Sequence, residues 1–362
     1  MKRILISPSK YIQGEDELYN LSIYVKDFSK KALLVASKID QARVQNYLDK
    51  ALEDNTIEIV YGEFREECTK NEIDRIRKLA DEKGCGVFIG LGGGKALDTA
   101  KAASFLSEKP VVIVPTIAST DAPTSKLAII YTEEGIFEEY FHLKKNPDLV
   151  LVDSRIIANA PTRFLVAGMG DALSTYFEAR SCIRSNANNI PGGKSTKAAF
   201  AIAKTCFEIL IEESLKAKVA CDANVVNQAL ENVIEANILL SGLGFESSGL
   251  AAAHSIHNGL TVLEETHQYY HGEKVSFGVI VHLVLENSPQ EELENVIKYC
   301  KSVGLPTCLK DLGIVKVTKD KIMAVAKAAC AEGETIHNML FPITPEDVYA
   351  AIIVADKIGG LG

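Results

Sequence analysis

The sequence contains no apolar run that approaches the roughly 18 residues of a membrane-spanning helix. Its first apolar stretch, Ile4 to Ile6, is far shorter than the roughly 7–15-residue core of a secretory signal peptide. The eight cysteines are scattered and include no C-x-x-C pair, which is typical of buried thiols in a reducing compartment rather than of disulfides or a zinc knuckle. These absences predict a cytoplasmic protein that does not bind membranes.

The sequence also lacks long runs of charged residues of one sign. No run of like charges reaches five or six residues, so a charged tail is excluded. The 39 Lys and Arg are outnumbered by 48 Asp and Glu, a net charge of −9, which argues against a nucleic-acid partner because such binding needs clustered cations. With 47% hydrophobic residues over 362 positions, the composition predicts a folded chain of two domains.

The first 150 residues alternate between short β-rich runs and longer helical patterns. The expected strands are Arg3–Ser7, Ala32–Ala36, Ile57–Tyr61, Gly86–Gly90, Val111–Pro115 and Leu149–Val152, with a hairpin over Leu127–Phe141. The helical patterns between them are Glu15–Phe28, Gln41–Asn55, Thr69–Lys83 and Lys95–Ser107. Such alternation builds a mostly parallel sheet with helices on both faces. We therefore expect an α/β domain over residues 1–160.

The pattern changes after Val152, where apolar residues begin to recur every three or four positions. The expected helices are Arg163–Cys182, Lys194–Leu215, Ala223–Leu240, Gly249–Leu263, Glu273–Leu285, Glu291–Val303, Lys319–Ala331 and Pro345–Ile358. Polar breaks that contain glycine, such as Gly242–Gly244, separate them. With Asp153–Pro161 as the linker, we expect an all-α domain over residues 161–362.

The segment GLGGGKALDTAK, Gly90–Lys101, follows an apolar strand and opens a helix. A helix start at a strand end offers free N–H groups and a favourable dipole to an anion, and three successive glycines let the backbone approach a phosphate. The segment fits neither G-x-G-x-x-G, because position 95 is lysine, nor a Walker A loop, because Ala96 follows that lysine. A tight turn without a ligand is the alternative, and we favour a phosphate or nucleotide site.

A second loop, Pro115–Lys126, follows the next strand and is rich in hydroxyl and carboxyl groups. Its polar side chains are Thr116, Ser119, Thr120, Asp121, Thr124 and Ser125. Open α/β sheets bind ligands at the carboxyl ends of their strands, where this loop and the glycine segment should both lie. The loop could equally be a turn that satisfies its own backbone, but its place beside the glycine segment favours a functional role.

Four of the seven histidines, His254, His257, His267 and His271, fall within 18 residues. The first two are three positions apart on an expected helix and can face one side. Imidazole nitrogens are common ligands of transition metals, so the cluster indicates a metal site, although a histidine in a core or on a surface needs no metal.

A carboxylate would complete the metal site, and the segment Gly168–Ala179 offers two. Asp171 is expected just inside a helix, with Glu178 two turns later on roughly the same face. An aspartate near a helix start is more often an N-cap than a ligand. The spacing alone therefore leaves the choice of ligands open.

Together these segments resemble the glycerol dehydrogenases, the zinc branch of the iron-type (group III) alcohol and polyol dehydrogenase superfamily. The resemblance covers essentially the whole chain and rests, in order, on GLGGGKALDTAK, PTIASTDAP, AGMGDALSTYFEA, GLAAAHSIHNGLT and HGEKVSFG. It implies a Rossmann-like α/β domain followed by an all-α domain, the dehydroquinate synthase-like fold, and a homo-oligomer that could be an octamer.

The resemblance also assigns roles to individual residues. It implies that Asp171, His254 and His271 hold the metal, which leaves His257 and His267 outside the ligand set. The substrate contact falls on Asp121, which we group with the three ligands as the catalytic set. The cofactor contacts fall on Gly92, Gly93, Gly94, Lys95, Asp98, Thr116, Ser119, Ser125, Leu127 and Tyr131.

Two departures from the superfamily pattern affect the choice of metal and cofactor. Iron-dependent members carry a histidine four residues after the aspartate, where this chain has Thr175, and this favours a three-ligand zinc site. The usual acidic residue after the second strand is absent, because the sequence there is Ala36-Ser37-Lys38. NAD is the expected cofactor, and Ser37 leaves NADP open as an alternative.

The expected reaction is the reversible oxidation of glycerol to dihydroxyacetone by hydride transfer to NAD, assisted by zinc. The alternatives in the same superfamily are another polyol or alcohol dehydrogenase, glycerol-1-phosphate dehydrogenase and 3-dehydroquinate synthase. The last two act on phosphorylated substrates and should place cations at the site, and Lys274 could supply one. A nucleotide-binding regulator without turnover is the alternative from another class.

Overall fold

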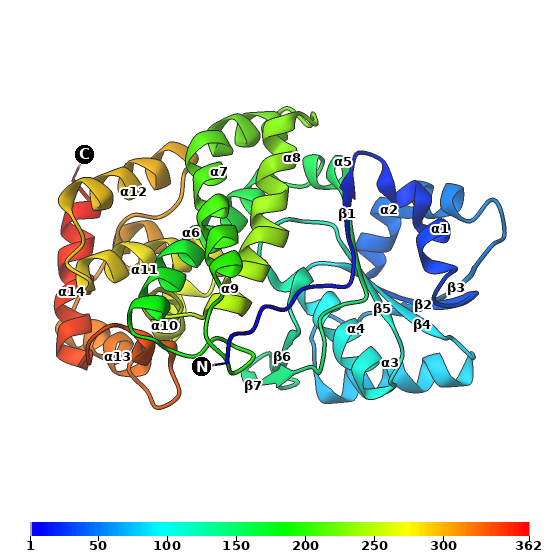
Figure 1. The fold of residues 1–362 in the computed structure, drawn as a ribbon, viewed down its shortest axis with the longest axis horizontal. Coiled ribbons are helices and arrows are strands. Elements are labelled where there is room, and N and C mark those ends of the chain that lie inside the picture. Colours follow the sequence, from blue (N-terminus) through cyan, green and yellow to red (C-terminus); the bar gives the residue numbers. More distant parts are fainter. Residues whose placement is uncertain (1, 362) are drawn as a thin grey trace. The chain divides into compact units, whose positions relative to one another are not determined.

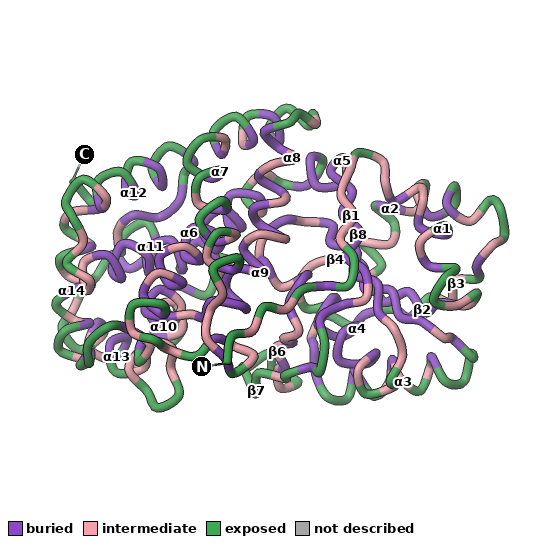
Figure 2. The backbone as a smooth tube through the Cα atoms, in the orientation of Figure 1, coloured by how far each residue is buried: buried purple, intermediate pink, exposed green. Residues whose placement is uncertain are grey.

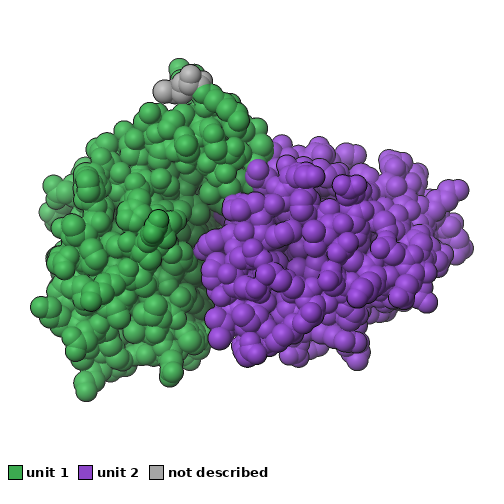
Figure 3. Space-filling model, turned by 90° about the horizontal axis from the view of Figure 1, so that it is seen from below, with its two compact units in different colours: residues 1–6, 162–219, 235–362 green, residues 7–161, 220–234 purple. Residues whose placement is uncertain are grey.

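A computed structural model describes residues 2–361 of the chain, which form two compact units (Figure 3). The α/β unit contains residues 7–161 and 220–234, and the helical unit contains residues 1–6, 162–219 and 235–362. The main boundary between the units lies between residues 161 and 162, and two short segments belong to the unit on the other side of it. Residues 1–6 belong to the helical unit, and residues 220–234 belong to the α/β unit.

The α/β unit is built on a six-stranded parallel sheet with the strand order β1-β8-β5-β4-β2-β3 (Figure 1). The strands are β1 (Tyr11–Gly14), β2 (Lys31–Ala36), β3 (Glu58–Glu63), β4 (Val87–Gly92), β5 (Val111–Pro115) and β8 (Leu149–Asp153). Every residue of β4, β5 and β8 is buried, as expected of central strands that are covered on both faces. The carboxyl ends of these strands meet at one edge of the sheet.

Helices and a hairpin complete the α/β unit. They are η1 (Glu17–Asn20), α1 (Leu21–Val25), α2 (Lys38–Ala51), α3 (Lys70–Glu82), α4 (Gly94–Leu106), η2 (Ala122–Thr124), β6 (Leu127–Tyr131), β7 (Phe137–His142), α5 (Ser154–Ala158) and α8 (Gln228–Glu235). The expected strand Arg3–Ser7 is wrong: only Arg3 makes an isolated bridge, to Lys194. The place beside β8 is taken by Tyr11–Gly14 instead.

In the helical unit, several helices pack around one buried helix, α11. Its elements are α6 (Thr162–Arg184), α7 (Lys197–Asp222), η3 (Ala236–Leu240), α9 (Ser241–Ser248), α10 (Ala252–Leu260), η4 (Glu264–Thr266), α11 (His271–Leu285), α12 (Gln290–Val303), η5 (Leu309–Leu312), α13 (Lys319–Ala329), η6 (Thr335–Asn338) and α14 (Pro345–Gly359). Residues 272–283 of α11 are all buried, and α11 packs against α6, α10, α12 and α14 (Figure 2). No helix among residues 2–361 is both long and apolar enough to cross a membrane.

The expected break at Gly242–Gly244 is wrong, because these residues form part of α9. A Cβ on Gly244 would lie 2.5 Å from the Cγ2 atom of Thr175 on α6. The glycine therefore allows two helices to pack closely and does not end one. The expected fold, an α/β domain with a parallel sheet followed by a helical domain, is confirmed.

Candidate functional site

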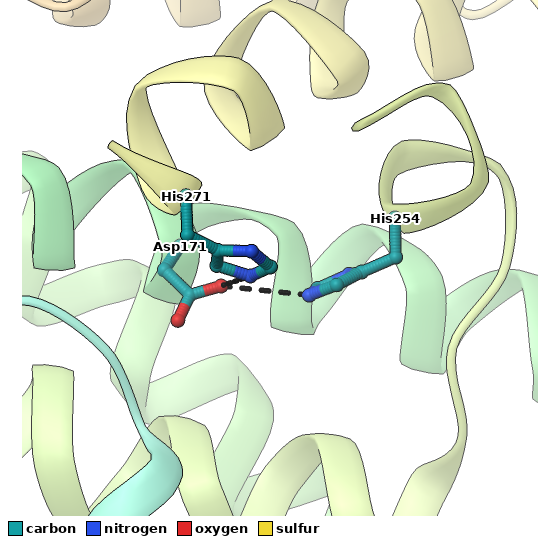
Figure 4. Close-up of side chains that lie close together, drawn as sticks. All are labelled: Asp171, His254 and His271. Atoms are coloured by element: carbon teal, nitrogen blue, oxygen red, sulfur yellow. Dashed lines mark ion pairs between the residues drawn. The ribbon is translucent and has the colours of Figure 1, made fainter. Parts of the chain in front are cut away.

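Three side chains from three helices converge inside the helical unit (Figure 4). Asp171 lies in the middle of α6, His254 lies on α10, and His271 is the first residue of α11. Because α6 begins at Thr162, the interpretation of Asp171 as an N-cap is wrong. Asp171 is 1% exposed, whereas its two histidine neighbours are 15% and 34% exposed, so the cluster is open on the imidazole side.

The helices that carry Asp171 and His271 touch through their backbones. A Cβ on Gly272 would lie 1.8 Å from the carbonyl oxygen of Ala167, and one on Gly170 would lie 2.3 Å from the carbonyl oxygen of Gly272. Only glycine fits at both positions, since such distances are far below a van der Waals contact. Gly170 and Gly272, which are next to Asp171 and His271 in sequence, therefore allow α6 and α11 to approach closely enough for these two side chains to meet.

The spacing of the three side chains fits a divalent zinc ion. The Oδ1 atom of Asp171 lies 3.2 Å from Nε2 of His271 and 3.5 Å from Nε2 of His254. Zinc bonds of about 2.0–2.1 Å at a tetrahedral angle place neighbouring ligand atoms about 3.3–3.4 Å apart. One ligand atom from each residue lies within 4.8 Å of the other two. One carboxylate oxygen and two imidazole nitrogens are suitable zinc ligands, and they leave a fourth position for substrate.

Glu178, one of the two carboxylates singled out in the sequence, orients His254. It is fully buried, and its Oε2 atom accepts a hydrogen bond of 2.6 Å from Nδ1 of His254. Its Oε1 atom accepts from the backbone N–H groups of Ala251 and His254, at 2.8 and 3.1 Å. When His254 is neutral, Nδ1 carries the proton that is donated to Glu178, and the lone pair is on Nε2, which faces Asp171. Such a carboxylate–histidine pair fixes the tautomer of a metal ligand.

A longer chain of hydrogen bonds orients His271. The Glu334 carboxylate accepts from the amide nitrogen of Asn258 at 3.0 and 3.2 Å, which turns the amide oxygen towards Nδ1 of His257 at 3.0 Å. An oxygen can only accept, so the neutral His257 carries its proton on Nδ1 and its Nε2 accepts from Nδ1 of His271 at 3.1 Å. When His271 is neutral, its lone pair is therefore on Nε2, which faces Oδ1 of Asp171.

Without a metal ion, the charges of the cluster shift the pKa values of three of its groups. Burial alone would raise the pKa of Asp171, but the imidazoles of His271 and His254 hold it well below the usual range, so the carboxylate is ionised. Burial alone would lower the pKa of His254, but the carboxylates of Glu178 and Asp171 raise it well above its usual value. Burial, together with the positive charges of His271 and Lys274, lowers the pKa of His257, which is therefore neutral.

Two other residues that the sequence placed near the metal have different partners. His267 donates from Nε2 to the carbonyl oxygen of Thr261 at 2.9 Å on the surface and takes no part in the cluster. Thr175, which stands where iron-dependent relatives carry a histidine, is fully buried and shares a hydrogen bond of 2.8 Å with the hydroxyl of Ser241. Neither side chain is a ligand in the arrangement described above.

The glycine segment lies at the carboxyl end of β4 in the α/β unit. Gly92 ends the strand with φ of 135°, a conformation that favours glycine, Gly93 is the N-cap of α4, and Gly94 is the first residue of the helix. A Cβ on Gly94 would meet nothing within 4 Å, so a ligand can approach the backbone there. Lys95 follows and forms an ion pair with Glu67, which offsets its charge.

The second loop lies beside the first. Thr116 follows β5, its backbone N–H donates to Gly92 at 3.1 Å, and Ser119 lies in the partly exposed loop after it. Leu127 and Tyr131 are the two ends of β6. The loop is held by the buried Lys101, whose ammonium group donates to the carbonyl oxygens of Ala122, Ser125 and Leu127.

Asp98, like Lys101, makes contacts that hold neighbouring parts of the α/β unit together. Its carboxylate pairs with Lys101 at 2.8 Å and accepts from the backbone N–H of Ile129 at 3.0 Å. The predicted cofactor residue Asp98 therefore helps to hold β6 against α4. Sequence reasoning missed the role of Lys101, because a lysine inside a helix gives no sign that its end is buried.

Comparison with known proteins decides the family. Residues 8–154 match the family of iron-containing alcohol dehydrogenases. Over 99% of its length the chain is 52% identical to a glycerol dehydrogenase from a strain of Escherichia coli, of which it covers 98%. The chain belongs to the iron-containing alcohol dehydrogenase family, among the glycerol dehydrogenases.

A solved glycerol dehydrogenase supports this placement. The crystal structure of the enzyme from Schizosaccharomyces pombe has a TM-score of 0.95 and 39% identity, over 99% of this chain and 91% of that chain. A glycolaldehyde reductase from Halobacterium salinarum is 43% identical over 99% of this chain and 98% of its own length. The resemblance inferred from the sequence is thus confirmed, and the chain is an oxidoreductase.

Two residues, Asp121 and Lys274, concern which substrates this alcohol dehydrogenase could bind. Asp121, the predicted substrate contact, is the N-cap of η2 in the α/β unit and is 9% exposed. Lys274 lies one turn after His271 on α11 and is 7% exposed, and burial lowers the pKa of its ammonium group. A phosphorylated substrate would need a cation here, and burial disfavours the charged form of Lys274.

Proposed function

We propose that the chain catalyses the reversible oxidation of glycerol by NAD to dihydroxyacetone, NADH and a proton, with a zinc ion held by Asp171, His254 and His271. The observation that carries the proposal is the convergence of one carboxylate oxygen and two imidazole nitrogens at the spacing of zinc ligands. The full-length identity to a glycerol dehydrogenase supports the same substrate.

When bound, the zinc ion supplies Lewis-acid stabilisation of negative charge on a substrate oxygen. The chain contributes the geometry for it. Glu178 and His257 hold the protons of the two ligand imidazoles on Nδ1, so that both Nε2 lone pairs are directed to one point. The partly exposed His271 leaves room there for a neutral diol, and Asp121 is proposed to contact it.

Cofactor binding is assigned to the α/β unit. The free N–H groups at the start of α4, from Gly93 to Lys95, would hold the pyrophosphate, because a helix start attracts anions. The rest of the dinucleotide is proposed to contact Thr116, Ser119, Ser125, Leu127 and Tyr131. Asp98 would act indirectly through its contacts with Lys101 and β6.

Zinc is proposed rather than iron because of the ligand count. A third histidine, as a fourth ligand, would favour iron, but Thr175 stands at that position and is fully buried with its hydroxyl bonded to Ser241. The remaining set of one oxygen and two nitrogens with an open position is typical of catalytic zinc.

The test has two parts: metal is removed from the purified protein and returned to it, and two matched histidine variants are compared with it. The purified protein is stripped with a chelator, and NAD reduction by glycerol is measured before and after addition of zinc or ferrous iron, alongside the metal content. We expect activity to disappear and to return with one equivalent of zinc. His271→Ala should lose metal and activity, whereas His267→Ala, which changes an exposed histidine outside the cluster, should keep both. Turnover without metal, or an active His271→Ala variant, would refute the assignment.

A second candidate substrate class is a small hydroxyaldehyde, which the enzyme would reduce with NADH. The 43% identity to a glycolaldehyde reductase favours testing it. A substrate panel with glycerol, glycolaldehyde and glycerol 1-phosphate separates the possibilities by kcat/KM. Preference for the phosphorylated compound would indicate that Lys274 is charged and contacts the phosphate group. Absence of turnover with every compound, despite bound nucleotide, would support a regulator.

We also propose a cellular compartment and an oligomeric state for the protein. All eight cysteines are free thiols, which supports a reducing compartment such as the cytoplasm. The resemblance to other glycerol dehydrogenases leads us to propose a homo-oligomer, up to an octamer. Light scattering of the purified protein would give the mass, and a monomer of 39.3 kDa would contradict the assembly.

A further inference from the structure

One carboxylate beside the glycine segment has no role in the site described so far. Asp40 is the third residue of α2, the helix that follows β2. Because β2 is the parallel neighbour of β4, with Val35 opposite Gly90, the start of α2 lies beside the end of β4 where the glycines begin. The fold therefore brings Asp40 to the edge at which the nucleotide is proposed to bind.

The Asp40 carboxylate lies between the ends of three strands. Its Oδ2 atom accepts a hydrogen bond of 2.8 Å from the hydroxyl of Ser37, just after β2. The same oxygen would lie 3.0 Å from a Cβ on Gly92, at the end of β4. Its Oδ1 atom accepts from the hydroxyl of Thr116, just after β5, at 3.3 Å. The side chain is 20% exposed, so a ligand at this edge can reach it.

The charges around Asp40 do not favour an additional phosphate. Arg43 pairs with Oδ1 of Asp40 at 3.3 Å, and Lys38 pairs with Glu63 at 3.0 Å. Each nearby cation thus has a carboxylate partner in the described structure. A dianionic phosphate placed against Asp40 would be repelled, whereas a ribose hydroxyl could donate to Oδ2, whose donor in the structure is Ser37.

We propose that Asp40 is the specificity-determining residue that binds the adenosine ribose of NAD and discriminates against NADP. Dinucleotide-binding α/β folds that use NAD commonly place a carboxylate where it accepts from the ribose hydroxyls. In this chain the residue directly after β2 is not acidic, because Ala36 is followed by Ser37. Ser37 instead holds the carboxylate of Asp40, one turn further on, towards Gly92. The inference rests on the proposed use of a nicotinamide dinucleotide.

The test measures binding rather than turnover. NADH and NADPH are titrated into the zinc-loaded wild type, Asp40→Asn and Asp40→Ala, and the increase of nicotinamide fluorescence is followed. Removing a charged acceptor of hydrogen bonds weakens NADH binding by about tenfold or more. NADPH binding is expected to be unchanged or tighter, so the preference for NADH falls by at least that factor. Calorimetry with ADP-ribose and 2′-phospho-ADP-ribose should show the same change, which places it at the adenosine end.

The chain offers a matched control for the loss of charge. Asp49→Asn removes a carboxylate from the same helix, at an exposed position whose side chain accepts from Gln45. It should bind both dinucleotides like the wild type. Thermal unfolding shows whether each variant is folded, and Asp40→Asn keeps an amide oxygen that can still accept from Ser37.

The outcomes separate this inference from the proposed function. If the folded Asp40 variants keep the wild-type ratio of NADH to NADPH affinity, the inference is wrong while the dehydrogenase assignment stands. A wild type that prefers NADPH would also overturn it. If the wild type binds neither dinucleotide, the proposed function itself fails.

Discussion

Replacing Glu178 with glutamine tests how strongly the carboxylate that accepts from His254 controls metal binding at the candidate zinc site. Glu178 is fully buried and accepts three hydrogen bonds, one from the imidazole of His254 and two from backbone N–H groups. Burial alone would raise its pKa, but the charge and hydrogen bonds of His254 lower it, so the carboxylate is ionised. The substitution keeps the shape of the side chain and removes its charge and one acceptor.

The expected magnitude follows from what glutamine cannot do. Its amide has one accepting oxygen, so its NH2 group must face at least one of the three donors, and His254 loses the partner that holds its proton on Nδ1. Changes to such outer partners typically lower metal affinity by about 10–100-fold, or about 1.4–2.8 kcal/mol. An unsatisfied buried donor also costs about 1–3 kcal/mol of folding free energy in the metal-free protein.

The control is Glu286→Gln, another buried carboxylate in the helical unit. Glu286 accepts from Arg180 and Ser181 and does not contact any of the three ligands. Burial alone would raise its pKa, but hydrogen bonds from His282 and Ser181 and the charge of Arg180 lower it to about 2. This variant should lose stability and keep its zinc affinity.

Competition with a chromophoric chelator measures the zinc affinity of both variants, and urea unfolding of the metal-free proteins measures their stability. We expect Glu178→Gln alone to bind zinc at least tenfold more weakly, with a matching fall in activity at limiting zinc. A folded Glu178→Gln protein whose zinc dissociation constant lies within twofold of the wild type would refute the reasoning.

Three further predictions concern packing, the second hydrogen-bond chain and pH. Gly272→Ala places a methyl group against the carbonyl of Ala167, so urea unfolding should show a loss of about 3 kcal/mol or more, together with weaker zinc binding in titrations. Glu334→Gln releases the amide of Asn258, and zinc titration should show about tenfold lower affinity with little change in the unfolding midpoint. Because the folded pKa of Glu286 is depressed from 4.5 to about 2, its contribution to stability is complete above about pH 4.5 and is lost as pH falls towards 2. Unfolding midpoints across that range should fall more steeply for the wild type than for Glu286→Gln.

Much of the fold could be predicted because its patterns are local. The buried strands β4 and β5 are apolar throughout, and β5 has the predicted bounds Val111–Pro115. The helix starts at Thr69 and Thr344 carry side-chain caps, as expected where hydroxyl residues precede helical patterns. The two errors, a strand at Arg3–Ser7 and a break at Gly242–Gly244, are places where the local pattern was overridden. At Gly242–Gly244, the glycine at position 244 is explained by close packing against Thr175 and not by a break between helices.

The site was only partly predictable, because its contacts join distant segments. His254, His257 and His271 are close in sequence, and the cluster was visible as a concentration of histidine. Which of them face Asp171 depends on how α6, α10 and α11 pack, and periodicity does not contain that information. The partner of Asn258 lies 76 residues later, at Glu334, so no local signal could identify it.

By itself the sequence determined the strand–helix alternation, the helical second half, the glycine segment at a helix start and, through ordered motifs, the family. These are properties of neighbouring residues, since backbone preference and hydrophobic periodicity act over a few positions. Only the tertiary structure decided that Asp171, His254 and His271 share one point, that Glu178 and Glu334 fix the protons of the two imidazoles, and that Asp40 lies against Gly92. Those relations depend on helix packing and strand order, which bring together side chains that are far apart along the chain.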